Sequence, residues 1–283
     1  MATRSDHIAA AITQRTHLRF SGIGDSLHSS AKSISLRTAD LPIGEGLVLA
    51  LRLTPTRIEC EVRPETFARA LLDTLHEPDN DGRPLFDSIA GWVHSRSGRI
   101  RIHTRNGTYR AEIPTDRWPT DWSEFRLSVS SAPFPLREST PADTEAAIIE
   151  WGCATASLMM TLLPIEEKQE SGEEEGTLTR VIANRYERSR RNRAAALTIH
   201  GTSCAGCGID FGAKYGPAFI GRIHVHHKIP VSQMGPGYVV NPSTDLIPLC
   251  PNCHHVVHTQ DPPLTVEELK ELLAAARTTK PSE

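Results

Sequence analysis

The sequence predicts an α+β protein made of two domains joined by an acidic linker, and three observations support this. Residues 166–176, EEKQESGEEEG, contain six glutamates and no large apolar side chain, so this stretch cannot bury enough surface to order itself. Upstream, strand-like alternation occurs beside segments with the apolar spacing of helices. Downstream, four cysteines form two close pairs around a group of histidines. We therefore expect domains at residues 1–165 and 177–283; a solvated helix end instead of a flexible linker would leave the boundary unchanged.

Length and composition suit a soluble protein. A chain of 283 residues with 39% apolar content is typical of one large or two ordinary domains. It contains no run of about 18 apolar residues, so no membrane span is expected. The first residues lack the basic and apolar regions of a secretory signal, which predicts a cytoplasmic location and reduced cysteines. Between residues 177 and 258, nine Lys and Arg residues outweigh three acids, which favours a polyanionic partner for this segment alone.

The N-terminal domain is expected to mix strands and helices. Alternating apolar and polar residues predict strands, and apolar residues three or four positions apart predict helices. Cys60 and Cys153 belong to this domain, and we expect both to be buried free thiols. The expected elements, in chain order, are two strands within 46–64, an amphipathic helix at 64–77 with Pro64 in its first turn, a hairpin at 99–113 with Asn106 and Gly107 at its turn, a strand at 124–131 and a long helix from Thr140 to about Leu163.

A second helix, rich in arginine, is expected from Thr177 onward. A solvated helix face is the usual meaning of such a run, and contact with phosphates is the alternative. The arginines concerned are Arg185, Arg188, Arg190, Arg191 and Arg193.

Four cysteines predict a structural zinc site. Cys204 and Cys207 form one pair, Cys250 and Cys253 form the other, and two residues separate the cysteines of each pair. This spacing lets both thiolates reach one ion from a tight turn, and four thiolates complete a tetrahedral Zn²⁺ site. A redox motif would need only one pair in a strand-to-helix setting, which neither pair shows. The zinc would therefore hold together the two ends of the 42-residue segment between the pairs.

Histidines cluster in the same region, where residues 200–258 contain seven of the thirteen. His254 and His258 are four residues apart, so on a helix they share one face and form half of a second metal site. A third ligand is available between His224 and His227. In a strand, His224 and His226 face one side and His227 faces the other, so one of two neighbouring histidines can bind metal while the next points elsewhere.

These residues follow one order: CAGC at 204–207, HHKIP at 226–230 and DLIPLCPNCHHVVH at 245–258. This order resembles an HNH endonuclease of the ββα-metal fold. Within that group it is most similar to the McrA-like enzymes, which restrict modified DNA. The resemblance covers about residues 200–275 and does not extend to the N-terminal domain.

The resemblance implies a role for each residue of the motif. His226 takes the place of the first ligand of the catalytic metal, and His254 and His258 complete that metal site. His227 takes the place of the general base that activates water. Asp245 stands where the family usually has an asparagine, which is a departure. An aspartate can accept the same hydrogen bond from an imidazole, and its charge would also raise the basicity of that imidazole.

Phosphodiester hydrolysis fits these side chains. A neutral histidine suits removal of a proton from water near neutral pH. A divalent cation such as Mg²⁺, Mn²⁺, Co²⁺ or Ni²⁺, held by imidazoles with coordination positions left open, suits the charge that develops on the leaving oxygen. The expected substrate is double-stranded DNA, and Lys214 and Lys228 join the five arginines as candidate phosphate contacts. Cleavage of both strands would need two such centres, which favours a homodimer. His224 and His255 receive no role.

So small a catalytic module has little room to read sequence, so we expect residues 1–165 to recognise a modified base or backbone. The predicted hairpin carries several arginines, and a two-stranded ribbon can enter a groove, although a solvated face explains them nearly as well. A flipped base would need aromatic pocket walls, for which core packing is the usual alternative. The aromatic candidates are Trp92, Tyr109, Trp118, Trp122 and Phe125, and the hairpin arginines are Arg99, Arg101, Arg105 and Arg110.

Two other functions remain open. A non-catalytic zinc-knuckle DNA-binding protein would need the four cysteines and the basic helix, but not the second set of histidines. An HNH nuclease of toxin or phage origin would keep the same chemistry in another biological setting. Toxins of this fold usually end much longer chains and phage HNH proteins are usually shorter, so the domain at 1–165 favours recognition.

Overall fold

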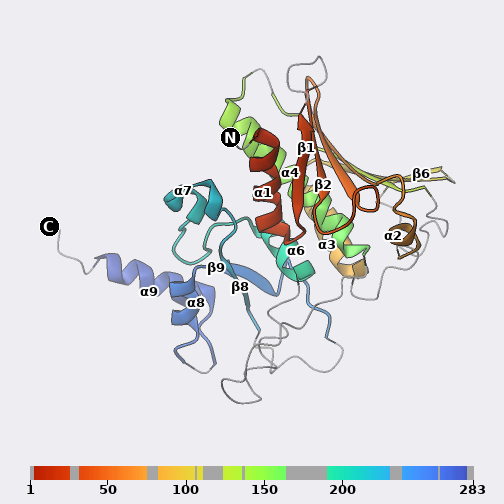
Figure 1. Cartoon of the computed structure of the whole chain (residues 1–283). Coiled ribbons are helices and arrows are strands. Elements are labelled where there is room, and N and C mark those ends of the chain that lie inside the picture. The colour runs from red at the N-terminus through yellow and green to blue at the C-terminus, as the bar shows by residue number, and fades with distance from the viewer. Residues whose placement is uncertain are drawn as a thin grey trace. The chain divides into compact units, whose positions relative to one another are not determined.

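The structure is a computed structural model (Figure 1). The chain divides into two compact units, Met1–Glu166 and Glu167–Glu283. The acidic segment 166–176 and the expected basic helix up to residue 189 lie outside the described residues. None of the described helices is long and apolar enough to cross a membrane. The residues that the structure describes are 3–25, 32–74, 82–105, 107–110, 124–135, 138–163, 190–229, 238–260 and 262–278.

The first unit, called the sheet unit below, is built on one seven-stranded antiparallel sheet with the order β1-β2-β3-β4-β7-β5-β6. The first four strands are neighbours in sequence as well as in space. β7 comes from later in the chain and joins β4 to β5. The strands are β1 (Phe20–Asp25), β2 (Lys32–Thr38), β3 (Leu47–Leu53), β4 (Ile58–Pro64), β5 (Arg99–Thr104), β6 (Gly107–Arg110) and β7 (Arg126–Ser130).

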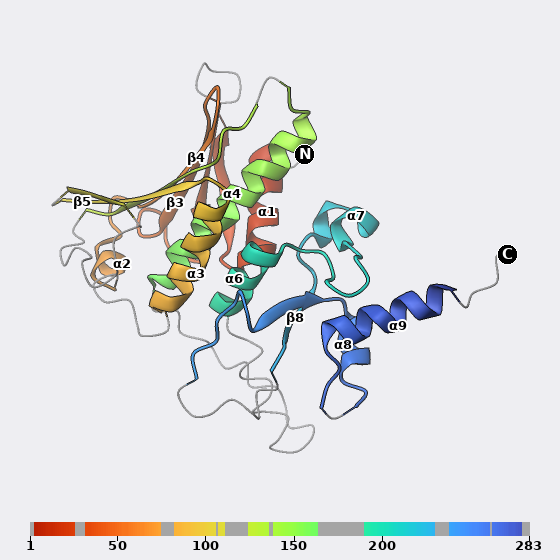
Figure 2. The same cartoon turned by 180° about the vertical axis from the view of Figure 1, so that it is seen from behind.

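Three helices, α1, α3 and α4, cover one face of this sheet, as the opposite views of Figures 1 and 2 show. The alternation of the strands explains why they pack there. In β4, Ile58, Cys60 and Val62 are buried, while the intervening Glu59 and Glu61 are only partly buried. The helices of this unit are α1 (Arg4–Thr16), α2 (Arg69–Thr74), α3 (Gly82–Ser95) and α4 (Pro141–Thr161).

The longest helix, α4, packs against both helices and strands. It begins with a capping box, in which the side chains of Thr140 and Asp143 each accept a hydrogen bond from the backbone of the other residue. From Trp151 onward every residue of the helix is buried, which is why the second half of its sequence is apolar or small. A Cβ at Gly152 would lie 2.8 Å from Cδ1 of Ile12, so glycine allows α4 to approach α1 closely.

The two cysteines of the sheet unit are buried and free, as the sequence predicted. Burial raises the pKa of Cys60 to about 12 and that of Cys153 to about 11. Both side chains are therefore neutral thiols at physiological pH and pack as small apolar groups.

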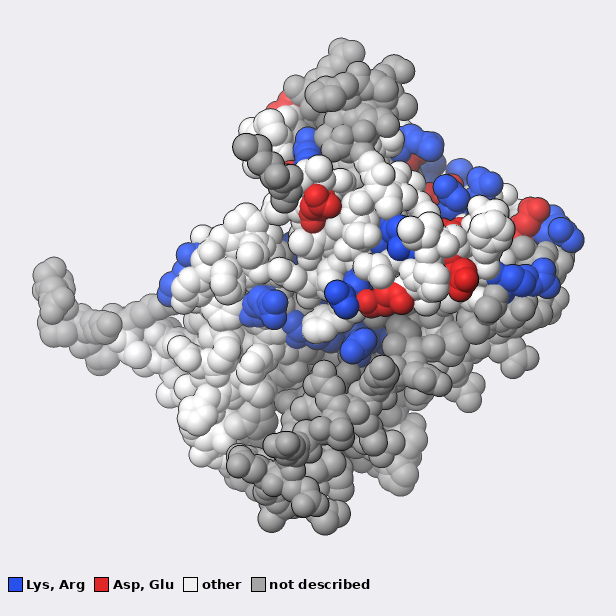
Figure 3. Space-filling view, in the orientation of Figure 1, with Lys and Arg blue, Asp and Glu red and all other residues white. Residues whose placement is uncertain are grey.

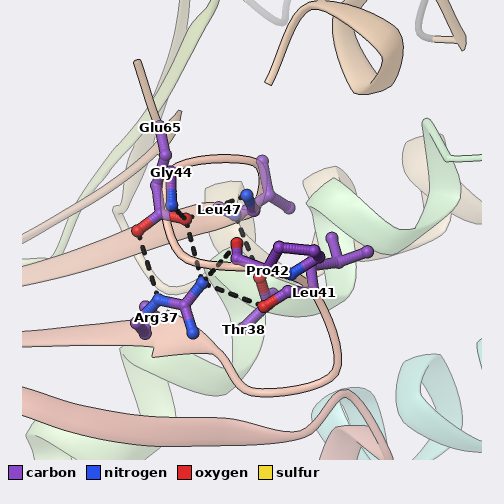
Figure 4. A network of polar contacts seen from close by, with 8 residues as sticks. Arg37, Thr38, Leu41, Pro42, Gly44, Leu47 and Glu65 are labelled. Atoms are coloured by element: carbon purple, nitrogen blue, oxygen red, sulfur yellow. Dashed lines mark hydrogen bonds and ion pairs between the residues drawn. The ribbon is translucent and has the colours of Figure 1, made fainter. Parts of the chain in front are cut away.

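A largely buried ion pair fixes the connection between β2 and β3 (Figure 4). The side chains of Arg37 and Glu65 are each 12% exposed, and Nε and Nη2 of Arg37 donate to the carboxylate at 3.2 and 3.1 Å. Glu65 also accepts hydrogen bonds from the backbone N–H groups of Gly44 and Gly46 at 3.1 and 2.9 Å. The Arg37 guanidinium and these N–H groups hold the pKa of Glu65 below its usual value, although burial opposes them.

The expected hairpin at 99–113 is present as β5 and β6, with Thr104 opposite Gly107 at its turn. However, β5 also pairs with β7 on its other side, with Ile102 opposite Leu127. The hairpin is therefore part of the main sheet, and its entry into a DNA groove stays a prediction. The strands expected within 46–64 and at 124–131 are confirmed as β3, β4 and β7.

The helix expected at 64–77 begins later than predicted, and its expected end at 75–77 lies outside the described residues. Pro64 ends β4, where it pairs with Leu47, and α2 begins only at Arg69. Proline fits a strand end as well as a first helical turn, and Glu65 is committed to the ion pair with Arg37, so a turn separates the strand from the helix. The segments α1, α3, β1 and β2 were not predicted.

The second unit, called the HNH unit below because its sequence resembles HNH endonucleases, contains a small two-stranded antiparallel sheet. β8 (His224–His227) pairs with β9 (Leu246–Leu249), and α8 (Pro251–Val257) follows β9 directly. The remaining elements are α6 (Arg190–His200), α7 (Phe211–Tyr215), the 3₁₀ turn η2 (Pro217–Phe219) and α9 (Val266–Thr278). The core combines apolar side chains with cysteines: Leu197, Cys204, Ile223, Leu249, Cys250, Cys253, Val257 and Leu269.

The last helix, α9, begins with a capping box. Thr265 and Glu268 form its capping box: the Thr265 hydroxyl accepts from the backbone N of Glu268 at 3.2 Å, and the Glu268 carboxylate accepts from the backbone N of Thr265 at 2.8 Å. Its buried Leu269 packs against the turn between the first two cysteines. The contact is so close that a Cβ at Gly206 would lie 2.6 Å from Cδ2 of Leu269, so glycine allows this contact. The helix therefore braces the cysteine cluster.

Candidate functional site

Four cysteine sulfurs come together in the HNH unit. The ligand atoms of Cys204, Cys207, Cys250 and Cys253 all lie within 4.8 Å of one another, and the Sγ atoms of Cys207 and Cys250 are 3.7 Å apart. Two thiolates that bind one tetrahedral Zn²⁺ at about 2.3 Å would be about 3.8 Å apart. The cluster therefore has the dimensions of a structural zinc site.

Backbone hydrogen bonds shape the two turns that carry these sulfurs. In the first turn, the N–H of Gly208 donates to the carbonyl of Cys204 at 2.8 Å, and Gly208 has a φ of +79°, which glycine adopts without strain. In the second turn, Cys250 is the N-cap of α8, and its sulfur accepts from the backbone N of Cys253 at 3.5 Å. The N–H of Ala205 donates to the carbonyl of Pro248 at 2.9 Å and joins the two turns.

Thiolates this close repel one another, and their surroundings shift the pKa values of Cys204 and Cys253 in opposite directions. Burial raises the pKa of Cys204, but N–H groups of the surrounding backbone outweigh burial and lower it to about 7. Burial, followed by contacts with the other cysteines, raises the pKa of Cys253. A divalent cation would offset the repulsion between the thiolates because it attracts all four of them at once.

Three histidines form a second cluster. His226 lies on β8, His254 lies on α8, and His258 is the C-cap of α8. One ring nitrogen of each lies within 4.8 Å of the others, and the three ring centroids are 4.9 to 5.2 Å apart in edge-on pairs. His226 is 4% exposed, whereas His258 is exposed, so the cluster is closed on one side and open to solvent on the other. Such a half-open imidazole cluster can hold a metal ion and still admit a substrate.

His226 is neutral at physiological pH. Burial lowers its pKa, and the neighbouring imidazoles of His254, His258 and His227 add to the effect, so that the pKa is about 3. A neutral imidazole keeps a lone pair on one ring nitrogen, and metal binding requires this lone pair. The electrostatics of the cluster therefore favour a cation over protons.

Asp245 is held in place by three hydrogen bonds from its own loop. Its Oδ2 accepts from the hydroxyl of Tyr238 and the backbone N of Asn241, both at 2.8 Å, and its Oδ1 accepts from the hydroxyl of Thr244 at 2.7 Å. Burial raises the pKa of Asp245, but these hydrogen bonds outweigh burial and keep the pKa below its usual value. Asp245 is thus a charged brace for the loop that leads into β9.

His227 lies next to this brace at the end of β8. It is buried and stands opposite Leu246 in the register of the two strands, and the following N–H, of Lys228, donates to the carbonyl of Asp245 at 2.8 Å. The charge of His227 also contributes to the lowered pKa of Asp245. The structure thus brings the general-base candidate beside the residue that replaces the family asparagine. The direct hydrogen bond expected between their side chains stays a prediction.

The basic residues named from the sequence have different positions. Arg185 and Arg188 lie outside the described residues. Arg193 donates to the carbonyl oxygens of Gly221 at 2.7 Å and Ile223 at 2.6 Å, which favours a role in holding the start of β8. Arg190, Lys214 and Lys228 are exposed and Arg191 is partly buried.

An aromatic group that sequence reasoning only partly identified lies just before β8. The rings of Phe211, Tyr215 and Phe219 follow one another with centroids 5.7 and 5.9 Å apart, and Nζ of Lys214 lies 5.4 Å from the ring centroid of Tyr215. Tyr215 is 56% exposed and Phe219 is 47% exposed. Their regular spacing of four residues could have revealed the group. Exposed rings beside a lysine are typical of surfaces that contact nucleic acids.

The aromatic candidates of the sheet unit are less available. Trp92 and Phe125 are buried, and the ring of Trp92 packs 5.7 Å from that of Trp151, so both belong to the core. Trp118 and Trp122 lie outside the described residues, as does the side chain of Tyr109. Over the part of this unit that Figure 3 colours, Lys and Arg side chains are interspersed with Asp and Glu side chains.

Comparison with known proteins assigns a family to the segment that carries both clusters. Residues 204–260 match the HNH endonuclease family. The match includes β8, β9, α8, the four cysteines and the three histidines, and it spans about one fifth of the 283-residue chain. No curated protein matches the chain, and no solved structure matches it.

Proposed function

We propose that the protein is a metal-dependent endonuclease that hydrolyses phosphodiester bonds of double-stranded DNA. The observation that carries this proposal is the convergence of His226, His254 and His258 within the segment that matches the HNH family. A DNA-binding protein without catalysis would need the cysteine cluster but not this second, half-open group of imidazoles.

The three histidines would hold the catalytic cation. When bound, the cation would stabilise the negative charge that develops on the phosphate and the leaving oxygen. A donor set made only of neutral imidazoles favours transition-metal ions such as Co²⁺, Ni²⁺ and Mn²⁺, whereas Mg²⁺ prefers oxygen ligands. The cysteine cluster would hold the Zn²⁺ that fixes β9 and α8, and through them two of the three histidines.

His227 would act as the general base. β8 directs the side chains of His226 and His227 to opposite faces, so the chain can bind the cation with one imidazole and accept a proton from the attacking water with the next. The carboxylate of Asp245 would stabilise the positive charge that His227 acquires with this proton.

Substrate contacts would come from the exposed side of the HNH unit. Arg190, Lys214 and Lys228 can reach phosphates, and Arg191 is partly available. The aromatic group at Tyr215 and Phe219 adds surfaces for sugars or bases. These contacts provide affinity with little sequence selectivity.

Plasmid cleavage tests the nuclease proposal. We expect the zinc-loaded protein to cleave supercoiled plasmid with Mn²⁺, Co²⁺ or Ni²⁺, and His227→Ala to lose about 100- to 10,000-fold in rate while it still binds the second metal ion. Linear product at early times would favour a homodimer with two centres, and nicked circles would favour a single centre. Full activity of His227→Ala would contradict its role as base, and DNA binding without cleavage in every metal would favour the non-catalytic alternative.

Within this class, we propose a type IV, modification-dependent restriction enzyme whose sheet unit reads a modified base or backbone. The support is that the sheet unit lies wholly outside the HNH match and that none of its described residues belongs to either cluster. The test uses full-length His227→Ala, which should bind without cutting. Its affinity is measured for duplexes with methylcytosine, hydroxymethylcytosine, methyladenine or phosphorothioate. Equal affinity for these and for unmodified DNA would favour the toxin or phage alternative.

A further inference from the structure

His224, which the motif leaves without a role, lies beside a member of the histidine cluster. Its Nδ1 is 3.4 Å from Nδ1 of His254, and the two ring centroids are 5.1 Å apart with an interplanar angle of 80°. His224 precedes His226 by two residues on β8, so both side chains project from the same face of the strand toward α8. His224 is exposed and His226 is buried, which puts His224 on the solvent side of the cluster.

The geometry separates His224 from the three ligand candidates. The group of residues whose ligand atoms all lie within 4.8 Å of one another contains His226, His254 and His258, and His224 falls outside it. Among the described residues, His224 contacts a ring nitrogen of His254, which is the arrangement of a residue that orients a ligand.

We propose that His224 is a positioning residue that holds His254 in the tautomer able to bind the metal ion. In this arrangement Nδ1–H of His254 donates a hydrogen bond to the lone pair of Nδ1 of His224, which carries its own proton on Nε2. The single proton of the neutral His254 ring is then on Nδ1. Its Nε2, which is buried, keeps the lone pair that a metal ion requires. This inference rests on the proposed metal site and deepens it.

The physical reason is that a neutral imidazole carries one proton on either of two nitrogens. Without a partner at Nδ1, the two tautomers are close in energy and the ring is free to turn, so part of the binding free energy is spent on selecting the productive state. A hydrogen-bond acceptor at Nδ1 removes this cost, and loss of such partners typically weakens metal binding about 10- to 100-fold. β8 provides this acceptor because its period of two places His224 and His226 on one face.

Calorimetric titration of the zinc-loaded, full-length protein with Ni²⁺ alone tests the proposal without reference to activity. We expect His224→Leu to weaken Ni²⁺ binding about 10- to 100-fold, with the cysteine-bound zinc and the melting temperature unchanged. We expect His224→Asn to restore binding, because its amide oxygen stands where Nδ1 of the imidazole was. His255→Leu is the matched control: His255 is an exposed histidine on the same helix as His254, and its removal should leave Ni²⁺ affinity unchanged.

The tautomer itself can be read from the ¹⁵N chemical shifts of the histidine ring nitrogens before Ni²⁺ is added, at a fixed pH of about 8, where imidazoles are neutral. We expect His254 to carry its proton on Nδ1 in the native protein and in His224→Asn. In His224→Leu we expect a mixture of the two tautomers.

Specific outcomes would overturn the proposal. Native Ni²⁺ affinity in His224→Leu would do so, as would a proton on Nε2 of His254 in the native protein. An X-ray absorption spectrum that counts four imidazoles around Ni²⁺ in the native protein and three in His224→Leu would make His224 a ligand instead. Failure of the proposed function looks different, because the native protein would then bind no Ni²⁺ beyond its zinc, and His226→Ala would change nothing.

Discussion

At the scale of single residues, the site separates tasks among neighbours. His226 is buried and neutral, with a pKa of about 3 caused first by burial and then by the adjacent imidazoles, which suits a ligand. His227, one residue later, faces the other side of β8 near the Asp245 carboxylate, which suits a proton acceptor. The proposed division of labour would therefore follow from strand geometry rather than from any difference in side-chain chemistry.

Asp245 allows a sharp test, because an asparagine can replace its hydrogen bonds. In Asp245→Asn, the amide oxygen can accept from Tyr238 and Asn241 as Oδ2 does, and the amide N–H can donate to the Thr244 hydroxyl. We expect the free energy of unfolding of this variant to lie within about 1 kcal/mol of that of the native protein. Asp245→Leu leaves three donors without their acceptor. It should lower the free energy of unfolding by about 1–3 kcal/mol for each of these groups that is buried. Thermal unfolding measures both.

The cleavage rate of Asp245→Asn then isolates the effect of the charge. A lower kcat with unchanged KM for DNA would show that the carboxylate supports the proton transfer at His227. Equal destabilisation of the asparagine and leucine variants would contradict the hydrogen-bond exchange.

Much of the candidate site could be predicted at this scale because its spacing is local. Two cysteines separated by two residues, or two histidines four apart on a helix, are fixed by the geometry of one turn. The contacts of Asp245 and of His224 could not be predicted, because they depend on how a loop and a strand pack against residues 7 and 30 positions away.

At the scale of elements, the strands and the helix that carry the histidine cluster are very short. β8 and β9 have four residues each and α8 has seven, lengths that are not stable in isolation. Their common neighbour is the cysteine cluster, and much of the surrounding core consists of the cysteines themselves. We therefore expect the order of the histidine cluster to depend on the zinc that the cysteines would hold.

Removal of zinc should unfold the HNH unit and leave the sheet unit intact. We expect a strong chelator, or Cys250→Ser, to abolish Ni²⁺ binding at the histidines and hydrogen-exchange protection in β8, β9 and α8, because metal binding and folding are coupled in such sites. Protection in β3, β4 and α4 should persist. Retained protection in α8 after complete zinc loss would contradict a structural role for the metal.

The capping boxes show why some elements were predictable and others were not. Thr140 with Asp143 marks the start of α4 through local hydrogen bonds, and sequence reasoning found this helix. Pro64 was ambiguous because proline suits both a strand end and a helix start, and the ion pair of Glu65 with distant Arg37 decided between them. Helix α1 has its own capping box at Thr3 and Asp6, a signal that was missed.

At the scale of the whole molecule, the two units are stabilised differently. The sheet unit relies on an apolar core between one face of the sheet and three helices, with the Arg37–Glu65 pair fixing the connection between β2 and β3. The HNH unit has a smaller core and would rely on its metal. A metal chelator should therefore destabilise the HNH unit, whereas a change in pH that protonates Glu65 should destabilise the sheet unit.

The ion pair gives the sheet unit a distinct dependence on pH. The pKa of Glu65 is lowered from 4.5, chiefly by Arg37, so the pair stabilises the fold fully above about pH 4.5, and this contribution is lost as the pH falls through the lowered value. We expect Glu65→Gln to lower the melting temperature of the sheet unit at pH 7, and the difference from the native protein to shrink below pH 4.5.

A matched control uses the exposed pair of Arg52 and Glu59, whose side chains are 59% and 46% exposed and whose charged atoms are 3.8 Å apart. Glu59→Gln should change the melting temperature little at any pH, because exposed ion pairs contribute little. A difference between native protein and Glu65→Gln that persists unchanged to pH 3 would contradict an ionic contribution.

Because Cys60 and Cys153 are buried, the reactivity of the remaining thiols reports whether the cysteine cluster of the HNH unit holds its zinc. Neither thiol is accessible or ionised in the native fold, and zinc would shield the remaining four from Ellman's reagent. We expect the intact, metallated protein to react negligibly with the reagent. After chelation, four thiols per chain should react, and the last two should react only in denaturant. A simple absorbance trace would then distinguish loss of the ion from global unfolding.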